Sequence, residues 1–124
     1  MLILYRYQSY IGPGGVLLAE MFDVHEKKLH IPETFKKTPI TKVNDQYVGL
    51  AWFEGEYKLH RHNVDEFFMV MEGHLTIEVE GEILEVGPQF CINIKAGERH
   101  KTKASRRTLV AIFEPQNIQI EWLE

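Results

Sequence analysis

The chain has 124 residues, 44% of them hydrophobic, and a formal net charge of −4, so it is long enough to bury a core without disulfides or metals. Its 14 lysines and arginines are scattered, which argues against a nucleic acid or an anionic membrane as a partner. One cysteine, Cys91, excludes an intrachain disulfide and fits a reducing compartment. No apolar run approaches the ~20 residues of a membrane-spanning helix, and MLILYRYQSY lacks the features of a signal peptide. We therefore predict a cytoplasmic protein.

The first 40 residues carry weak patterns. Residues 2–7 and 16–19 are predicted as strands on either side of the Gly-Pro-Gly-Gly sequence at 12–15. Pro32 and Glu33 are typical of a helix start, and Glu33 and Lys37 are spaced for an ion pair, so a short helix is predicted over residues 32–37. This part of the chain is expected to be an irregular N-terminal segment.

From Val43 onward, apolar and polar residues alternate. In the stretch HLTIEVE, Leu75, Ile77 and Val79 share one face of a strand. Gly73 and Gly81 mark tight turns on either side of it, so residues 66–71, 74–79 and 82–86 are predicted as an antiparallel meander. Further strands are predicted over residues 47–54, 90–94, 99–103, 108–114 and 118–122. Short strands at this spacing predict an all-β sandwich or barrel in a single domain over residues 1–124.

Ionisable residues gather in the stretch HRHNVDEFFMVMEG. On a strand, His60 and His62 point to the same side, about 6–7 Å apart, and can reach one metal ion. Glu66 opens the next strand and shares a face with Phe68, an unfavourable place for a carboxylate unless it is paired or bound. Two histidines at this spacing can also be surface residues. The nearby carboxylate of Glu66 favours a metal site.

A second polar cluster completes the pattern. The series His60-x-His62-x3-Glu66-x6-Gly73 and Gly87-x7-Lys95-x-Gly97-x2-His100 resemble the two conserved motifs of the cupin superfamily, over residues 45–115. The resemblance implies a small jelly-roll β-barrel in which His60, His62, Glu66 and His100 bind one divalent transition metal ion: Mn, Fe, Zn, Ni or Cu. Three imidazoles and a carboxylate suit such an ion.

The second motif departs from the family in two ways. Lys95 stands where the family usually has proline, and the segment from Gly87 to Lys95 is about two residues longer than usual, which predicts a bulge at residues 91–93. Neither departure removes a ligand, but both affect the loop beside His100.

The remaining polar and aromatic residues have simpler interpretations. Asp65 is an alternative carboxylate but is out of alternation with the motif. Phe68 and Phe113 are predicted to line the cavity around the ion, and Cys91 is interpreted as a small hydrophobe. Trp122 is expected to pack over the barrel or into a partner subunit. Residues expected at the surface are Arg61, Asn63, His74, His25 and His30.

Three functions are compatible with these motifs. The first is a metalloenzyme acting on a small polar metabolite, a dioxygenase or an isomerase or lyase, in which the ion acts as a Lewis acid. The second is a non-catalytic binding or sensor protein for a small ligand. The third is a structural metal site, which ranks last because structural sites are usually closed. A homodimer is expected because family members often dimerise.

Overall fold

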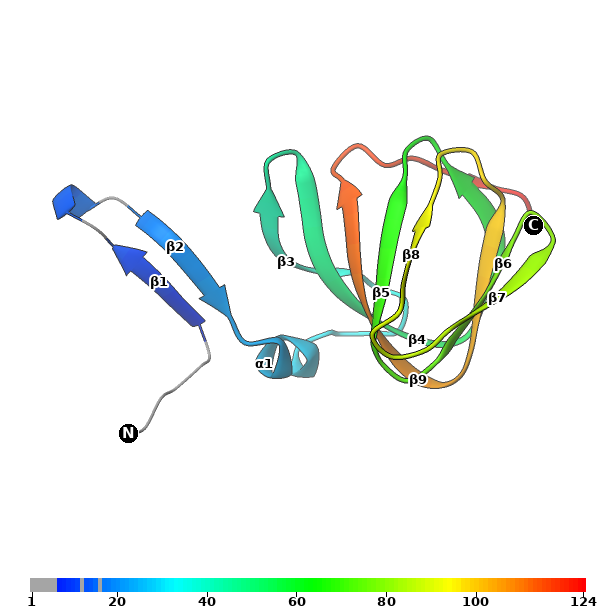
Figure 1. The fold of residues 1–124 in the computed structure, drawn as a ribbon, viewed down its shortest axis with the longest axis horizontal. Helices are drawn as coiled ribbons and strands as arrows, with labels where there is room; N and C mark the ends of the chain where they lie inside the picture. Colours follow the sequence, from blue (N-terminus) through cyan, green and yellow to red (C-terminus); the bar gives the residue numbers. More distant parts are fainter. Residues whose placement is uncertain (1–6, 12, 16) are drawn as a thin grey trace. The chain divides into compact units, whose positions relative to one another are not determined.

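A computed structural model describes residues 7–11, 13–15 and 17–124 (Figure 1). The chain divides into two compact units, Met1–His30 and Ile31–Glu124. In the described part of the chain, no helix is long and apolar enough to cross a membrane. The single domain over residues 1–124 stays a prediction.

In the described part of the first unit, two strands precede a short helix. Strand β1 (Tyr7–Ile11) pairs antiparallel with β2 (Leu17–Phe22), and the 3-10 turn η1 (Pro13–Gly15) lies between them. Helix α1 (Val24–Leu29) begins at Asp23, whose carboxylate accepts hydrogen bonds from the backbone N–H groups of His25 and Glu26. The strand predicted at 16–19 is confirmed over residues 17–19, which belong to β2, and residue 16 lies outside the described residues. The strand predicted over 2–7 also lies outside the described residues except for Tyr7.

The helix predicted over residues 32–37 is wrong. That segment forms a turn in which the N–H of Lys36 donates to the carbonyl of Glu33 at 3.3 Å, and Phe35 has a φ of 66°. A positive φ is incompatible with a right-handed helix. The N–H of Phe35 donates instead to the carbonyl of Trp52, so this segment lies along the barrel.

The second unit is one antiparallel sheet folded into two facing walls. Two long strands, β4 (Gln46–His62) and β9 (His100–Pro115), pair along their length and belong to both walls. The first wall has the order β3 (Thr38–Val43), β4, β9, β5 (Glu66–Glu72) and β8 (Cys91–Ile94). The second wall has the order β10 (Ile120–Trp122), β4, β9, β6 (Leu75–Val79) and β7 (Glu82–Val86). This is the predicted jelly-roll barrel.

The sheet folds along a corner that crosses three adjacent strands. The register of β4 with β9 shifts between Phe53 and Gly55, leaving residues 105–107 of β9 unpaired. Between β5 and β6 the corner lies at Gly73, which has a φ of +93° and on which a Cβ would lie 2.4 Å from Thr108 Oγ1. Thr108 Oγ1 accepts a hydrogen bond from the N–H of His74 at 3.0 Å. Only glycine fits this position without displacement.

The predicted meander is wrong in its first turn. Strands β5 and β6 do not pair with each other but follow one another along β9, which pairs with β5 near Val110 and with β6 near Thr102. The second turn, at Glu80 and Gly81, is confirmed as the hairpin between β6 and β7. The strands predicted at 99–103 and 108–114 are two halves of β9. The bulge predicted at 91–93 is absent, because β8 pairs with β5 in unbroken register.

Apolar residues from both walls fill one part of the barrel. Phe68, Val70 and Val110 of the first wall belong to the same buried cluster as Leu75 and Ile77 of the second wall. All five side chains are at most 4% exposed. The walls therefore pack face to face, and the charged and polar inward residues lie beyond this cluster.

Candidate metal centre

His60 and His62 are placed by the end of β4. The register of β4 with β9 shifts by one residue between Tyr57 and His60, which is a β-bulge. Beyond the bulge, His60 and His62 point into the barrel and are 5% and 7% exposed. Their ring centroids are 4.8 Å apart.

His100 completes the cluster from the neighbouring strand. It begins β9, directly opposite His60 in the register, and is 1% exposed. Its ring centroid lies 4.3 Å from that of His60 and 5.1 Å from that of His62. One ring nitrogen from each histidine lies within 4.8 Å of the others, so the three buried imidazoles can hold a single metal ion.

The outer ring nitrogens of two histidines are held by backbone carbonyls. His60 Nδ1 lies 2.7 Å from the carbonyl of Lys58, within the bulge, and His100 Nδ1 lies 2.9 Å from the carbonyl of Glu98. A carbonyl can only accept, so each Nδ1 donates, and each Nε2 carries a free lone pair. In the described part of the chain, Nε2 of His62 and of His100 is buried without a hydrogen-bond partner.

Burial also favours the form of histidine that binds metal. It lowers the pKa of His60 and His100, an effect opposed mainly by the carbonyls of Lys58 and Glu98. Both rings are therefore neutral at neutral pH, as metal coordination requires.

Glu66 faces the three histidines from the other wall. It is the first residue of β5 and is 7% exposed. Its Oε1 atom lies 3.2 Å from His62 Nε2 and 3.9 Å from His100 Nε2. A buried carboxylate this close to unpartnered imidazole nitrogens can complete a mixed nitrogen and oxygen ligand set.

These four residues line a cavity of about 180 Å³ between the walls. Phe68 lines it as predicted, but Phe113 does not: it points outward, is 38% exposed, and packs on Phe67 with ring centroids 5.3 Å apart. Alternation along β9 turns Phe113 away because Ile112 and Glu114 point inward. The full set that lines the cavity is Phe35, Lys37, Phe53, Tyr57, His60, His62, Glu66, Phe68, His100, Thr102, Ile112, Glu114, Ile118 and Ile120.

The other candidates lie away from the cluster. Asp65 is exposed and accepts a hydrogen bond from the N–H of Ala96 at 2.9 Å, so it orders the turn before His100. Cys91 is exposed, so its interpretation as a buried small hydrophobe is wrong. Trp122 packs over the barrel as expected, with its ring centroid 5.4 Å from that of His60.

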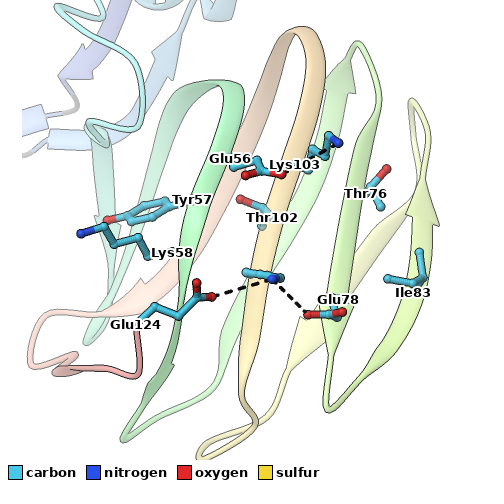
Figure 2. Close-up of a pocket in the computed structure, with 10 residues that line it drawn as sticks. Glu56, Tyr57, Lys58, Thr76, Glu78, Ile83, Thr102, Lys103 and Glu124 are labelled. Carbon is cyan, nitrogen blue, oxygen red and sulfur yellow. Dashed lines mark ion pairs between the residues drawn. The ribbon is translucent and has the colours of Figure 1, made fainter.

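A larger pocket, of about 300 Å³, lies on the outer face of the second wall (Figure 2). Glu78 and Glu124 both pair with Lys101, at 3.7 and 3.8 Å, and Lys103 pairs with Glu56 at 3.9 Å. These charges are exposed and pair with one another, so this pocket is a solvated surface rather than a metal site.

Four polar residues that line the inner cavity were not predicted from the sequence to lie there: Lys37, Tyr57, Thr102 and Glu114. Thr102 follows His100 by two residues, and this spacing alone places it on the same face. Lys37 and Glu114 carried no such signal, because they meet only through the pairing of distant strands.

The fold and this histidine cluster define a class of protein. Residues 53–113 match the family model described as "Cupin domain". The chain belongs to the cupin family.

The chain is also similar to individual proteins. The chain is 36% identical to the uncharacterized protein YdbB of Bacillus subtilis (strain 168), over 76% of this chain and 85% of YdbB. It is similar to the crystal structure of a cupin-2 domain containing protein from Shewanella frigidimarina, with a TM-score of 0.74 and 28% identity over 77% of this chain and 94% of that one. It shares the fold of hydroquinone 1,2-dioxygenase from Sphingomonas sp. TTNP3, with a TM-score of 0.60 and 12% identity over 71% and 68% of the two chains.

Proposed function

We propose that this chain binds one divalent first-row transition metal ion through His60, His62, Glu66 and His100, and that it is a metalloenzyme acting on a small polar metabolite. The observation that carries the proposal is the convergence of buried imidazole nitrogens without hydrogen-bond partners on one point beside a buried carboxylate. Leaving such nitrogens buried and unsatisfied costs about 1–3 kcal/mol each, and a bound ion would remove that penalty.

The donor set favours a functional ion over a structural one. Structural zinc sites are usually closed by four ligands, mostly cysteines and histidines. Here four mixed donors would leave positions open in a six-coordinate ion, and the adjoining cavity of about 180 Å³ gives a ligand room to reach it. The bound ion would act as a Lewis acid on a substrate oxygen.

The protein's own residues would set the environment of the reaction. The carbonyls of Lys58 and Glu98 orient two of the imidazoles. Phe53, Phe68 and Ile112 line the cavity with apolar surface, which would limit the entry of water. This arrangement suits dioxygenase chemistry or isomerase and lyase chemistry on a small chelating substrate, in the cytoplasm.

Metal content is the direct test. Protein purified without added metal, and protein equilibrated with Mn, Fe, Ni, Zn or Cu, should contain one ion per chain. The His60→Ala/His62→Ala variant should contain almost none, whereas the control His74→Ala should match the wild type, because His74 lies outside the cavity and pairs with Glu85. A wild-type protein that binds none of these ions would refute the metal site.

A second experiment separates enzyme from binder. The metal-loaded protein would be screened for oxygen uptake, isomerisation and elimination with catechols, enediols, hydroxy acids and keto acids. Turnover of any of them supports the enzyme. Stabilisation by a compound that is never converted would instead identify a non-catalytic binding or sensor protein.

A further inference from the structure

The wall of the cavity opposite the histidines carries a partly buried ion pair. Lys37 Nζ contacts Glu114 Oε1, and the two side chains are 26% and 7% exposed. Lys37 precedes β3, and Glu114 lies near the end of β9. Both line the cavity that contains His60, so the ion pair and the histidines face the same cavity.

A glycine makes room for this lysine. At Gly49, which is buried in β4, a Cβ would lie 2.8 Å from Lys37 Cγ and 3.1 Å from the carbonyl oxygen of Thr38. Any side chain there would displace the stem of Lys37. The absence of a side chain at Gly49 therefore allows the ammonium group to reach Glu114.

Stability alone gives little reason for the pair. Glu114 is buried and Lys37 is half-buried, so their desolvation offsets much of their attraction, and an apolar pair of similar size would serve the fold as well. Burial lowers the pKa of Lys37, and the charge of Glu66 acts in the opposite direction. Lys37 and Glu66 line the same cavity, which connects the ion pair to the candidate metal centre.

Thr102 provides a second, independent indication of a polar ligand. It is 4% exposed, lines the cavity, and follows His100 on the same face of β9. Among the described residues, its Oγ1 atom has no hydrogen-bond partner. A buried hydroxyl left unsatisfied costs about 1–3 kcal/mol, so this group is positioned for an oxygen atom that a ligand brings.

The volume and the charge of the cavity restrict the class of ligand that it can bind. A volume of about 180 Å³ corresponds to about six water molecules at ~30 Å³ each, so the part of a ligand that lies within the cavity is small. With a divalent ion on neutral imidazoles, the charges of the ion, Lys37, Glu66 and Glu114 leave one net positive charge. A ligand with one negative charge would neutralise the cavity.

We propose that the cavity binds a small monoanionic hydroxy acid, with its chelating end beside the histidines and Thr102 and a hydroxyl at its far end held by Lys37 and Glu114. Lys37 has further N–H donors and Glu114 has an acceptor oxygen. A ligand hydroxyl can therefore accept a hydrogen bond from Lys37 and donate one to Glu114. This inference rests on the metal site proposed above.

The wild-type protein provides the first test. Cobalt-loaded protein would be titrated with 2,4-dihydroxybutyrate and with 2-hydroxypentanoate, which has a methyl group in place of the far hydroxyl, and binding would be followed by the visible absorption of cobalt. The dihydroxy acid should bind about tenfold more tightly, because the methyl compound leaves the ion pair without its partner.

Three variants assign the selectivity to residues. Lys37→Met and Glu114→Leu should each reduce the affinity ratio to near one, because each removes one of the two groups that hold the far hydroxyl. Thr102→Val should weaken both acids about tenfold without changing their ratio or the affinity for cobalt. The matched control Lys36→Met should behave as wild type, because Lys36 is exposed and pairs with exposed Glu33.

The outcomes separate this inference from the proposed function. Cobalt binding with equal affinities for the two acids would overturn the ligand class and leave the metal site intact. A protein that binds no cobalt would overturn both. Selectivity that persists in both ion-pair variants would refute the role of Lys37 and Glu114, and unchanged binding in Thr102→Val would refute the role of Thr102.

Discussion

His60 and His100 lie directly opposite each other across the ladder of β4 and β9, with ring centroids 4.3 Å apart. Each ring is oriented by a backbone carbonyl two residues before it in the chain. The Nε2 atoms of the two rings are thus positioned by backbone geometry, so the proposed metal site would be preorganised before any ion binds.

Replacing Glu66 by glutamine should weaken metal binding at least tenfold. The amide keeps the shape of the side chain but removes the negative charge that favours a divalent ion. Competition with a chromogenic chelator would measure the affinity. Asp65→Asn is the matched control, since Asp65 is adjacent but exposed and should leave the affinity unchanged. Equal losses in both variants would show that only the overall charge matters.

The metal-free protein should become less stable as the pH falls from 8 to 5.5. Burial lowers the pKa of His60 and His100 in the folded state, so below the unfolded pKa of about 6.5 the unfolded chain binds more protons. Stability is full above that pH and declines below it. Urea midpoints measured across this range would show the decline, which should be smaller in a His60→Asn/His100→Asn variant. A midpoint that rises on acidification would contradict the effect.

Gly73→Ala should destabilise the fold by about 3 kcal/mol. The residue has a φ of +93°, and an added Cβ would lie 2.4 Å from Thr108 Oγ1. Gly81→Ala is the control: its φ of +84° is similar, but nothing lies within 4 Å, so about 1 kcal/mol is expected. Urea unfolding would give both values, and equal losses would show that backbone strain alone is responsible.

The homodimer expected from the family resemblance stays a prediction, and light scattering after gel filtration tests it. A dimer would give twice the chain mass of 14.5 kDa. Phe113 is 38% exposed on the outer face of the first wall, so Phe113→Ser should weaken a dimer formed through this face. A wild-type protein of single chain mass at all concentrations would refute the prediction.

The four residues of the cluster were predictable from sequence because their signal is local. His60 and His62 sit at strand spacing, and Glu66 and His100 occur at the offsets of two recognisable motifs. The bulge before His60 was not predictable. Strict alternation would turn Lys58 inward with His60, whereas the register shift turns Tyr57 inward and gives the carbonyl of Lys58 to His60.

The errors in predicting the fold from sequence have a non-local cause. Gly73 and Gly81 follow glutamate in the same way, yet only Gly81 closes a hairpin. At Gly73 the chain continues along β9 instead. Whether the chain turns back or continues at Gly73 depends on pairing with a strand about 30 residues further along the chain. The residues next to Gly73 in the sequence therefore do not predict it. Lys37 and Glu114 escaped prediction for the same reason.

Glu66 belongs to one wall of the barrel, and the three histidines belong to the other. An ion bound by Glu66 and the three histidines would therefore cross-link the two walls at the end of the barrel away from the apolar core. It would also tie the segment around His62 to His100 and shorten the loop that the chain must close on folding. Loss of the ion would release this end first, so amide hydrogen exchange near the starts of β5 and β9 would report whether the site is occupied.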